Sequence, residues 1–109
     1  MKTKMLTVAL LSALLGLTTT AFAQTRWKRT HPRRVEVNHR LAYQSKRIDN
    51  KVDNQQMSEK KSDKIQREDR QVRKEEKLMA SQDHGHITKQ EQKTLNVQEN
   101  RISKQIRNN

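Results

Sequence analysis

Three segments of the chain share one spacing of apolar residues. Each carries two aliphatic residues seven positions apart, with a long polar residue three positions after the first: Leu41, Gln44 and Ile48; Ile65, Glu68 and Val72; Leu95, Gln98 and Ile102. Seven residues are close to two turns of an α-helix, so both aliphatic residues of a segment lie on one helix face. Beyond Pro32 the chain has no further proline, and its only glycine there is Gly85. The pattern therefore predicts an all-α fold with three related helices.

The residues from Gly85 to Glu91 have the pattern of a structural turn between two of these helices. Glycine readily adopts the left-handed backbone angles that often end a helix, and Gly85 is suitably placed to do so. Thr88 can act as the N-cap of the next helix, and Glu91 follows three positions later, as a capping box requires. We therefore expect a structural turn formed by Gly85, Thr88 and Glu91.

The same reasoning gives a helical domain over residues 35–109, after a flexible basic N-terminal arm. Its expected helices lie at about 33–53, 58–81 and 88–107. Short turns favour antiparallel neighbours, so the expected architecture is an antiparallel helical hairpin or a thin three-helix bundle. Gln44, Glu68 and Gln98 would face inward and form a polar layer that sets the register of the helices. The alternative is that the helices barely pack and Glu68 stays in contact with water.

Residues 1–23 have the organisation of a secretory signal peptide. The basic start Met1–Lys4 precedes a mainly apolar run over residues 5–17, and Ala21-Phe22-Ala23 has the small-x-small pattern that signal peptidase recognises. The apolar run is shorter than the roughly 20 residues that span a bilayer. We therefore expect cleavage near Ala23 and a mature protein that is periplasmic or secreted.

The chain beyond residue 23 is strongly basic and poor in apolar residues. Without Lys2 and Lys4 it keeps 22 of the 24 basic residues against 12 acidic ones, which is a net charge of +10 over 86 residues. Only 13 of these 86 residues are Leu, Ile, Val or Phe, and the absence of cysteine excludes disulfides. Such a composition predicts a small core with marginal stability, or dependence on a partner or on oligomerisation.

Residues 24–34 are expected to form the flexible basic arm. The segment has five basic residues, no acidic residue and no apolar period. Its candidate anion-binding residues are Arg26, Trp27, Lys28, Arg29, Arg33 and Arg34. Two interpretations of Trp27 stay open: its ring stacks on or inserts into a partner, or it rests on the nearest helix of its own chain.

No stretch of the sequence has the residues that an enzyme site requires. There is no cysteine nucleophile, no glycine-rich phosphate loop and no serine in a nucleophile elbow. We therefore expect no catalytic activity, no cofactor and no metal site. The alternative is weak binding of a transition metal at His84-Gly85-His86, where Asp83 is the only nearby third ligand.

Charge is the remaining guide to partners. An exported basic protein meets anionic wall polymers, lipopolysaccharide, phospholipid head groups and released nucleic acid, and it has no expected role with genomic DNA. The expected helix at 58–81 interleaves basic and acidic residues, which predicts an amphoteric surface without a clean basic stripe. The favoured hypothesis is a non-enzymatic protein that binds an anionic envelope component. An alternative is binding of unfolded protein clients by apolar stripes that thin helices leave exposed.

Two segments of the chain contain longer sequence motifs. Val37–Ile48 contains Asn-x-Arg-Leu-x-x-Gln-x-x-Arg-Ile, and Gly85–Ser103 contains Gly-x-Ile-Thr-x-x-Glu. Both resemble segments of an uncharacterised family of small exported bacterial helical proteins, a resemblance that implies no particular activity. The stretch Ile87–Glu91 is also similar, more weakly, to the Leu-Thr-x-x-Gln helix starts of Spy/CpxP-like periplasmic chaperones. This second similarity implies the client-binding alternative, as a periplasmic stress chaperone.

Overall fold

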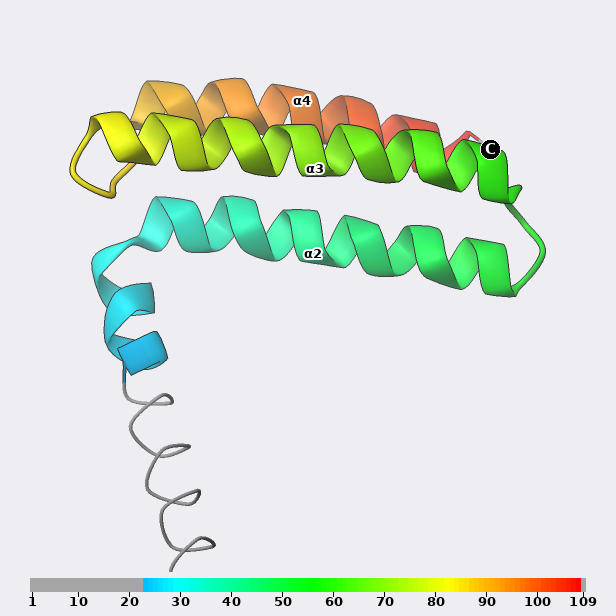
Figure 1. The fold of residues 1–109 in the computed structure, drawn as a ribbon, viewed down its shortest axis with the longest axis horizontal. Helices are drawn as coiled ribbons and strands as arrows, with labels where there is room; N and C mark the ends of the chain where they lie inside the picture. Colours follow the sequence, from blue (N-terminus) through cyan, green and yellow to red (C-terminus); the bar gives the residue numbers. More distant parts are fainter. Residues whose placement is uncertain (1–22, 109) are drawn as a thin grey trace, which may run out of the picture. The chain divides into compact units, whose positions relative to one another are not determined.

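The computed structural model describes residues 23–108, and every regular element in that range is helical. Helix α2 spans Pro32–Asp53, α3 spans Glu59–Gln82 and α4 spans Lys89–Arg107. Figure 1 shows α3 running back antiparallel to α2, and α4 running in the same direction as α2. The all-α prediction is confirmed, and the helices form an up-down-up bundle.

The chain divides into two units, residues 1–32 and residues 33–109. The bundle belongs to the second unit. The predicted signal peptide, residues 1–23, lies outside the described residues apart from Ala23.

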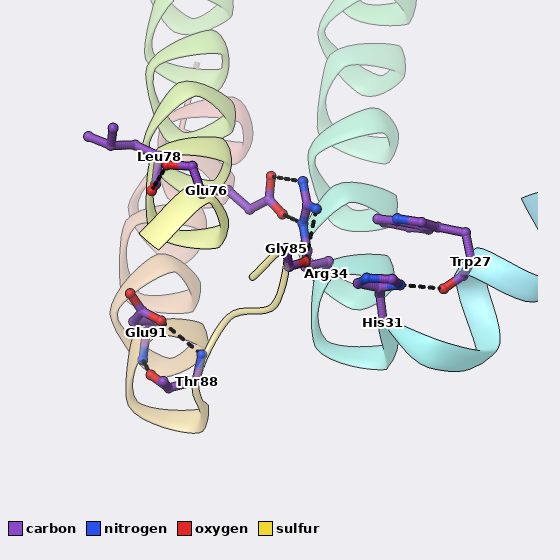
Figure 2. A network of polar contacts seen from close by, with 9 residues as sticks. Trp27, His31, Arg34, Glu76, Leu78, Gly85, Thr88 and Glu91 are labelled. Carbon is purple, nitrogen blue, oxygen red and sulfur yellow. Dashed lines mark hydrogen bonds and ion pairs between the residues drawn. The ribbon is translucent and has the colours of Figure 1, made fainter. Parts of the chain in front are cut away.

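Side-chain caps define where α3 and α4 begin. Ser58 is the N-cap of α3, and its Oγ accepts a hydrogen bond of 3.2 Å from the Lys61 N–H. At the start of α4, the Glu91 N–H donates to Thr88 Oγ1 at 3.1 Å, and the Thr88 N–H donates to Glu91 Oε1 at 2.8 Å (Figure 2). These two bonds form the capping box that the spacing of Thr88 and Glu91 predicts.

The turn between α3 and α4 uses left-handed backbone angles at two consecutive residues. His84 has a φ of 53° and Gly85 a φ of 90°. The Gly85 N–H donates to the Ala80 carbonyl oxygen at 2.8 Å, which satisfies one of the free carbonyls at the end of α3. Gly85 therefore has the conformation expected of a glycine that ends a helix.

The capping box makes a first prediction. Thr88→Ala should lower the free energy of unfolding by about 1 kcal/mol, because the Glu91 N–H loses its acceptor. Thr94→Ala is the matched control, since Thr94 lies exposed within α4 and alanine has the higher helix propensity. Urea denaturation followed by circular dichroism measures both variants. An equal loss in the two variants would contradict a capping role for Thr88.

The core of the bundle is a narrow line of apolar residues. The buried hydrophobic residues, each at most 6% exposed, are Val37, Leu41, Ile48, Met57, Ile65, Val72, Ala80, Ile87, Leu95, Ile102 and Ile106. They include all six aliphatic residues of the repeated spacing. The backbones of α3 and α4 approach each other more closely than either approaches α2.

The polar residues of the core differ from the predicted ones in two helices. Gln44 is buried, as predicted, but Asp69 and Glu99 are buried in place of Glu68 and Gln98. The residues three and four positions after the first aliphatic residue of each spacing lie near the same helix face. The rotation of the packed helix about its axis decides which of the two is buried. Glu68 is half-buried on the side of α3 next to α4, where it accepts a hydrogen bond of 2.7 Å from Gln105 Nε2. The prediction that Glu68 and Gln98 face inward is therefore wrong.

Candidate functional site

The N-terminal basic segment is helical over residues 23–30, where a flexible arm without helical structure was predicted. Its Arg26, Lys28 and Arg29 side chains are exposed. The hydroxyl of Thr30 bonds the carbonyl oxygens of Arg26 and Trp27, at 3.1 Å each. This segment has no apolar period because all residues from 23 to 30 are exposed, and an amphipathic helix shows such a period only where it buries one face.

Trp27 contacts a side chain of its own segment. Its ring stacks on the ring of His31, with centroids 4.6 Å apart and planes inclined by 12°. His31 Nδ1 also lies 2.9 Å from the Trp27 carbonyl oxygen (Figure 2). Of the two interpretations left open for Trp27, the structure shows an intramolecular contact, although the contact is with His31.

The last two predicted arm residues, Arg33 and Arg34, belong to α2. The Arg34 guanidinium forms an ion pair with the buried carboxylate of Glu76 on α3, and its Nη1 donates to the Gly85 carbonyl oxygen at 3.1 Å (Figure 2). Arg33 Nη1 donates to the Ile87 carbonyl oxygen at 3.4 Å. Their placement in a flexible arm is corrected, because both residues belong to α2 and their guanidinium groups contact other parts of the bundle. Their role in anion binding stays a prediction.

Besides Glu76, which pairs with Arg34, two carboxyl groups are buried in the bundle: Asp69 of α3 and Glu99 of α4 are 3% and 0% exposed. Gln44 of α2 adjoins Glu99: its Nε2 donates to the Glu99 carbonyl oxygen at 2.7 Å and to Ser103 Oγ at 2.9 Å. Among the described residues, neither carboxylate oxygen of Glu99 has a hydrogen-bond partner, and its ion pair with Arg40 spans 3.9 Å. This environment favours an uncharged carboxyl group.

The pKa values of both acids reflect their burial. Desolvation raises the pKa of Glu99 to about 8, an effect that Arg40 opposes and that Glu36 and Asp69 reinforce. Desolvation also raises the pKa of Asp69 to about 6, against the effect of two arginines of α3. At neutral pH most Glu99 carboxyl groups are therefore protonated. A protonated carboxyl costs much less to bury than a carboxylate.

Perturbed acids often mark catalytic sites, but a site also needs an opening to substrate. A groove of about 310 Å³ runs between α3 and α4, and polar side chains such as Gln71, Gln98 and Arg101 line it. Neither Asp69 nor Glu99 lines this groove. The two acids thus act as polar members of the core.

Helix α3 exposes six of its eight basic residues, Lys61 and Arg73 being half-buried, and only two of its six acidic ones. The exposed basic residues, called the basic face of α3 below, are Lys60, Lys64, Arg67, Arg70, Lys74 and Lys77. The buried or half-buried acidic residues of α3 are Glu68, Asp69, Glu75 and Glu76. The exposed acids Glu59 and Asp63 both precede Lys64. The amphoteric prediction holds for the start of α3, where Glu59 and Asp63 are exposed. From Lys64 onward the fully exposed charged residues of α3 are basic, because the acids there are buried or half-buried.

The other two helices differ in their exposed charge. The exposed basic residues of α4 are Lys89, Lys93, Arg101, Lys104 and Arg107, while Glu91 is half-buried in the capping box and Glu99 is buried. On α2, the exposed acids Glu36, Asp49 and Asp53 accompany the exposed cations. The strongest positive charge of the bundle therefore lies on α3 and α4.

The turn that contains His84 and His86 does not gather a set of metal ligands within residues 23–108. No group of three or more His, Cys, Asp or Glu side chains in this range is placed to hold a metal ion. His84 and His86 lie exposed in the turn before α4.

Within residues 23–108, no helix has both the length and the apolar character needed to cross a membrane.

The chain was also compared with family models, with curated proteins and with solved structures. None of the three comparisons gives a match.

Proposed function

We propose that this protein is an exported, non-enzymatic protein that binds an anionic component of the bacterial envelope. The basic face of α3 is the observation that carries the proposal. In the described part of the chain none of its six cations makes an ion pair. Clustered cations of this kind attract anionic ligands and accelerate their association. Arg26, Lys28 and Arg29 add three exposed cations on the N-terminal helix.

The location expected from the sequence supports this class of partner. Residues 1–23 have the sequence pattern of a cleaved signal peptide, with Ala23 at the expected cleavage point. Outside the cytoplasm, phosphate groups of lipopolysaccharide, phospholipids and wall polymers are the abundant anions. Their binding by lysine and arginine is electrostatic, so salt weakens it.

Titration of lipopolysaccharide into the protein tests the proposal. We expect binding at low salt that weakens steeply as salt is raised, because each cation that contacts a phosphate displaces counterions. Replacing Arg26, Lys28 and Arg29 by glutamine should weaken binding about tenfold, if each cation contributes about 0.5 kcal/mol at an exposed site. Isothermal titration calorimetry measures the affinity.

The control for this experiment is the variant Lys89→Gln, Lys93→Gln, Lys104→Gln, which removes the same charge from exposed positions of α4. If the anion contacts α3 and the N-terminal segment and not α4, this variant should bind within about threefold of the unchanged protein, although α4 is also basic. Absence of binding at low salt would contradict the proposed function. Unchanged affinity of the N-terminal variant would instead exclude the N-terminal segment from the binding surface.

The chaperone alternative receives less support from the packing. It requires apolar stripes open to unfolded clients, whereas the repeated aliphatic residues of all three helices are at most 3% exposed. The large hydrophobic residues exposed on the bundle, Tyr43, Leu78 and Val97, come from three different helices. Anion binding therefore accounts for more of the described surface.

A further inference from the structure

We propose that the basic face of α3 is the docking surface for a linear, phosphate-bearing polymer without nucleobases, which lies along the helix axis. The inference rests on the anion binding proposed above, and it names the surface and the class of partner. It follows from the arrangement of the exposed cations, from the apolar residues of α3 and from the absence of aromatic residues on this helix.

The cations of the basic face form lines parallel to the helix. Lys60, Arg67 and Lys74 are seven residues apart, so they follow one side of α3 at intervals of about 10.5 Å. Arg70 and Lys77, also seven residues apart, form a second line beside the first. From Lys60 to Lys77 the face is about 26 Å long. The exposed Asp63 lies between Lys60 and Arg67 on this side, and from Lys64 onward the array has no fully exposed acid. This long and narrow array of cations is complementary to an extended chain of phosphates.

The array begins at a hollow where cations converge. The hollow has a volume of about 330 Å³, and four basic side chains line it: Lys60, Lys61, Lys64 and Arg67. Ser58, the N-cap of α3, also lines it. A concave surface lined by one sign of charge concentrates counter-ions, so one end of a phosphate chain would be held here.

The apolar residues of α3 argue against a bilayer as the partner of this face. A helix that lies in a membrane interface inserts its apolar side among the lipid chains. The apolar side of α3 is already used in the core, where Ile65 is 0% and Val72 is 3% exposed. Leu78 is the one large hydrophobic residue of α3 that is exposed. The basic face can therefore bind phosphates, but apart from Leu78 it has no large apolar side chain to insert among lipid chains.

The absence of aromatic residues argues against single-stranded nucleic acid. Proteins that bind such strands stack the bases on aromatic side chains. Helix α3 has no aromatic residue, and the exposed Tyr43 lies on α2, where the Arg47 guanidinium is 5.8 Å from its ring centre. The basic face has cations that can bind phosphates but no aromatic side chains that could stack on bases. It therefore suits a phosphate polymer without bases.

The test compares two variants of equal net charge. The first, Lys64→Gln, Arg67→Gln, Lys74→Gln, removes three cations from the basic face of α3. The second is the α4 control, Lys89→Gln, Lys93→Gln, Lys104→Gln. The probe is inorganic polyphosphate of defined chain length, titrated into each protein over a series of salt concentrations. Circular dichroism verifies that both variants keep the helical content of the unchanged protein.

We expect the α3 variant to lose at least tenfold in affinity at low salt, and the α4 control to stay within about threefold. The plot of log affinity against log salt should become shallower by about 2 for the α3 variant, because each lost contact with a flexible polyanion removes about 0.7 from the slope. The slope for the control should not change.

Several results would overturn the inference. Equal losses in the two variants would show that binding follows net charge and not this face. Tighter binding of a single-stranded oligonucleotide with the same number of phosphates would show that bases are recognised. Binding of lipopolysaccharide or phosphatidylglycerol vesicles without binding of polyphosphate would exclude the linear polymer and leave the proposed function standing. Failure to bind any of these probes at low salt would contradict both.

Discussion

Replacing Arg34 by methionine should lower the free energy of unfolding by about 3–5 kcal/mol, because the variant leaves a buried carboxylate without its counter-ion. The Glu76 side chain is 0% exposed, and Arg34 pairs with it through Nε and, at 3.4 Å, through Nη2. Arg34 also donates to the Gly85 carbonyl oxygen, so one guanidinium joins α2, α3 and the turn before α4. Urea denaturation at pH 7, followed by circular dichroism, measures the loss.

Two further variants test this explanation. Arg33→Met removes a neighbouring arginine that makes a weak hydrogen bond of 3.4 Å to a backbone carbonyl oxygen, and should cost less than about 1 kcal/mol. The double variant Arg34→Met, Glu76→Met should recover most of the lost stability, since a well-packed apolar pair can replace a buried ion pair. The double variant also gives a measurement if Arg34→Met does not fold. Equal stability of Arg34→Met and the unchanged protein would contradict the role assigned to Arg34.

Glu99→Gln should make the bundle more stable at pH 8 and remove most of its pH dependence. Burial raises the pKa of Glu99 from an ordinary value of 4.5 to about 8. The folded protein therefore binds this proton more tightly than the unfolded chain does. The resulting stability is complete below pH 4.5 and is lost as the pH rises towards 8. A shift of this size corresponds to roughly 3–5 kcal/mol.

Urea denaturation at pH 5 and at pH 8 measures this effect. The unchanged protein should have the lower denaturation midpoint at pH 8, whereas Glu99→Gln should show a much smaller difference. The remaining difference should come from Asp69, whose pKa is raised to about 6 and whose contribution is lost between pH 3.8 and 6. Glu68→Gln is the control, because Glu68 lies at the edge of α3 and its loss should leave the pH dependence in place. Equal stability of the unchanged protein at the two pH values would contradict the prediction.

The burial of acids and the basic exterior have one structural cause. Asp69 and Glu76 are seven residues apart, on the side of α3 that faces the other helices. Arg67 and Lys74, also seven apart, are exposed. Packing α3 into the bundle thus separates charges that alternate along the chain, at the expense of burying ionisable groups in the core.

The sequence by itself determined the helices and their ends. The seven-residue aliphatic spacing predicted helices at about 33–53, 58–81 and 88–107, and the structure has Pro32–Asp53, Glu59–Gln82 and Lys89–Arg107. These features are local, because a helix face and a capping box involve residues only a few positions apart. The helix at 23–30 was missed because it buries no face.

Only the tertiary structure decided which polar residues face inward. The choice of Asp69 over Glu68, and of Glu99 over Gln98, depends on how each helix is rotated against its two neighbours. The pairing of Arg34 with Glu76 joins residues 42 positions apart, a separation that no local pattern reveals. The same rotation decided that α3 presents a basic face, because charge on a helix surface depends on which side the core covers.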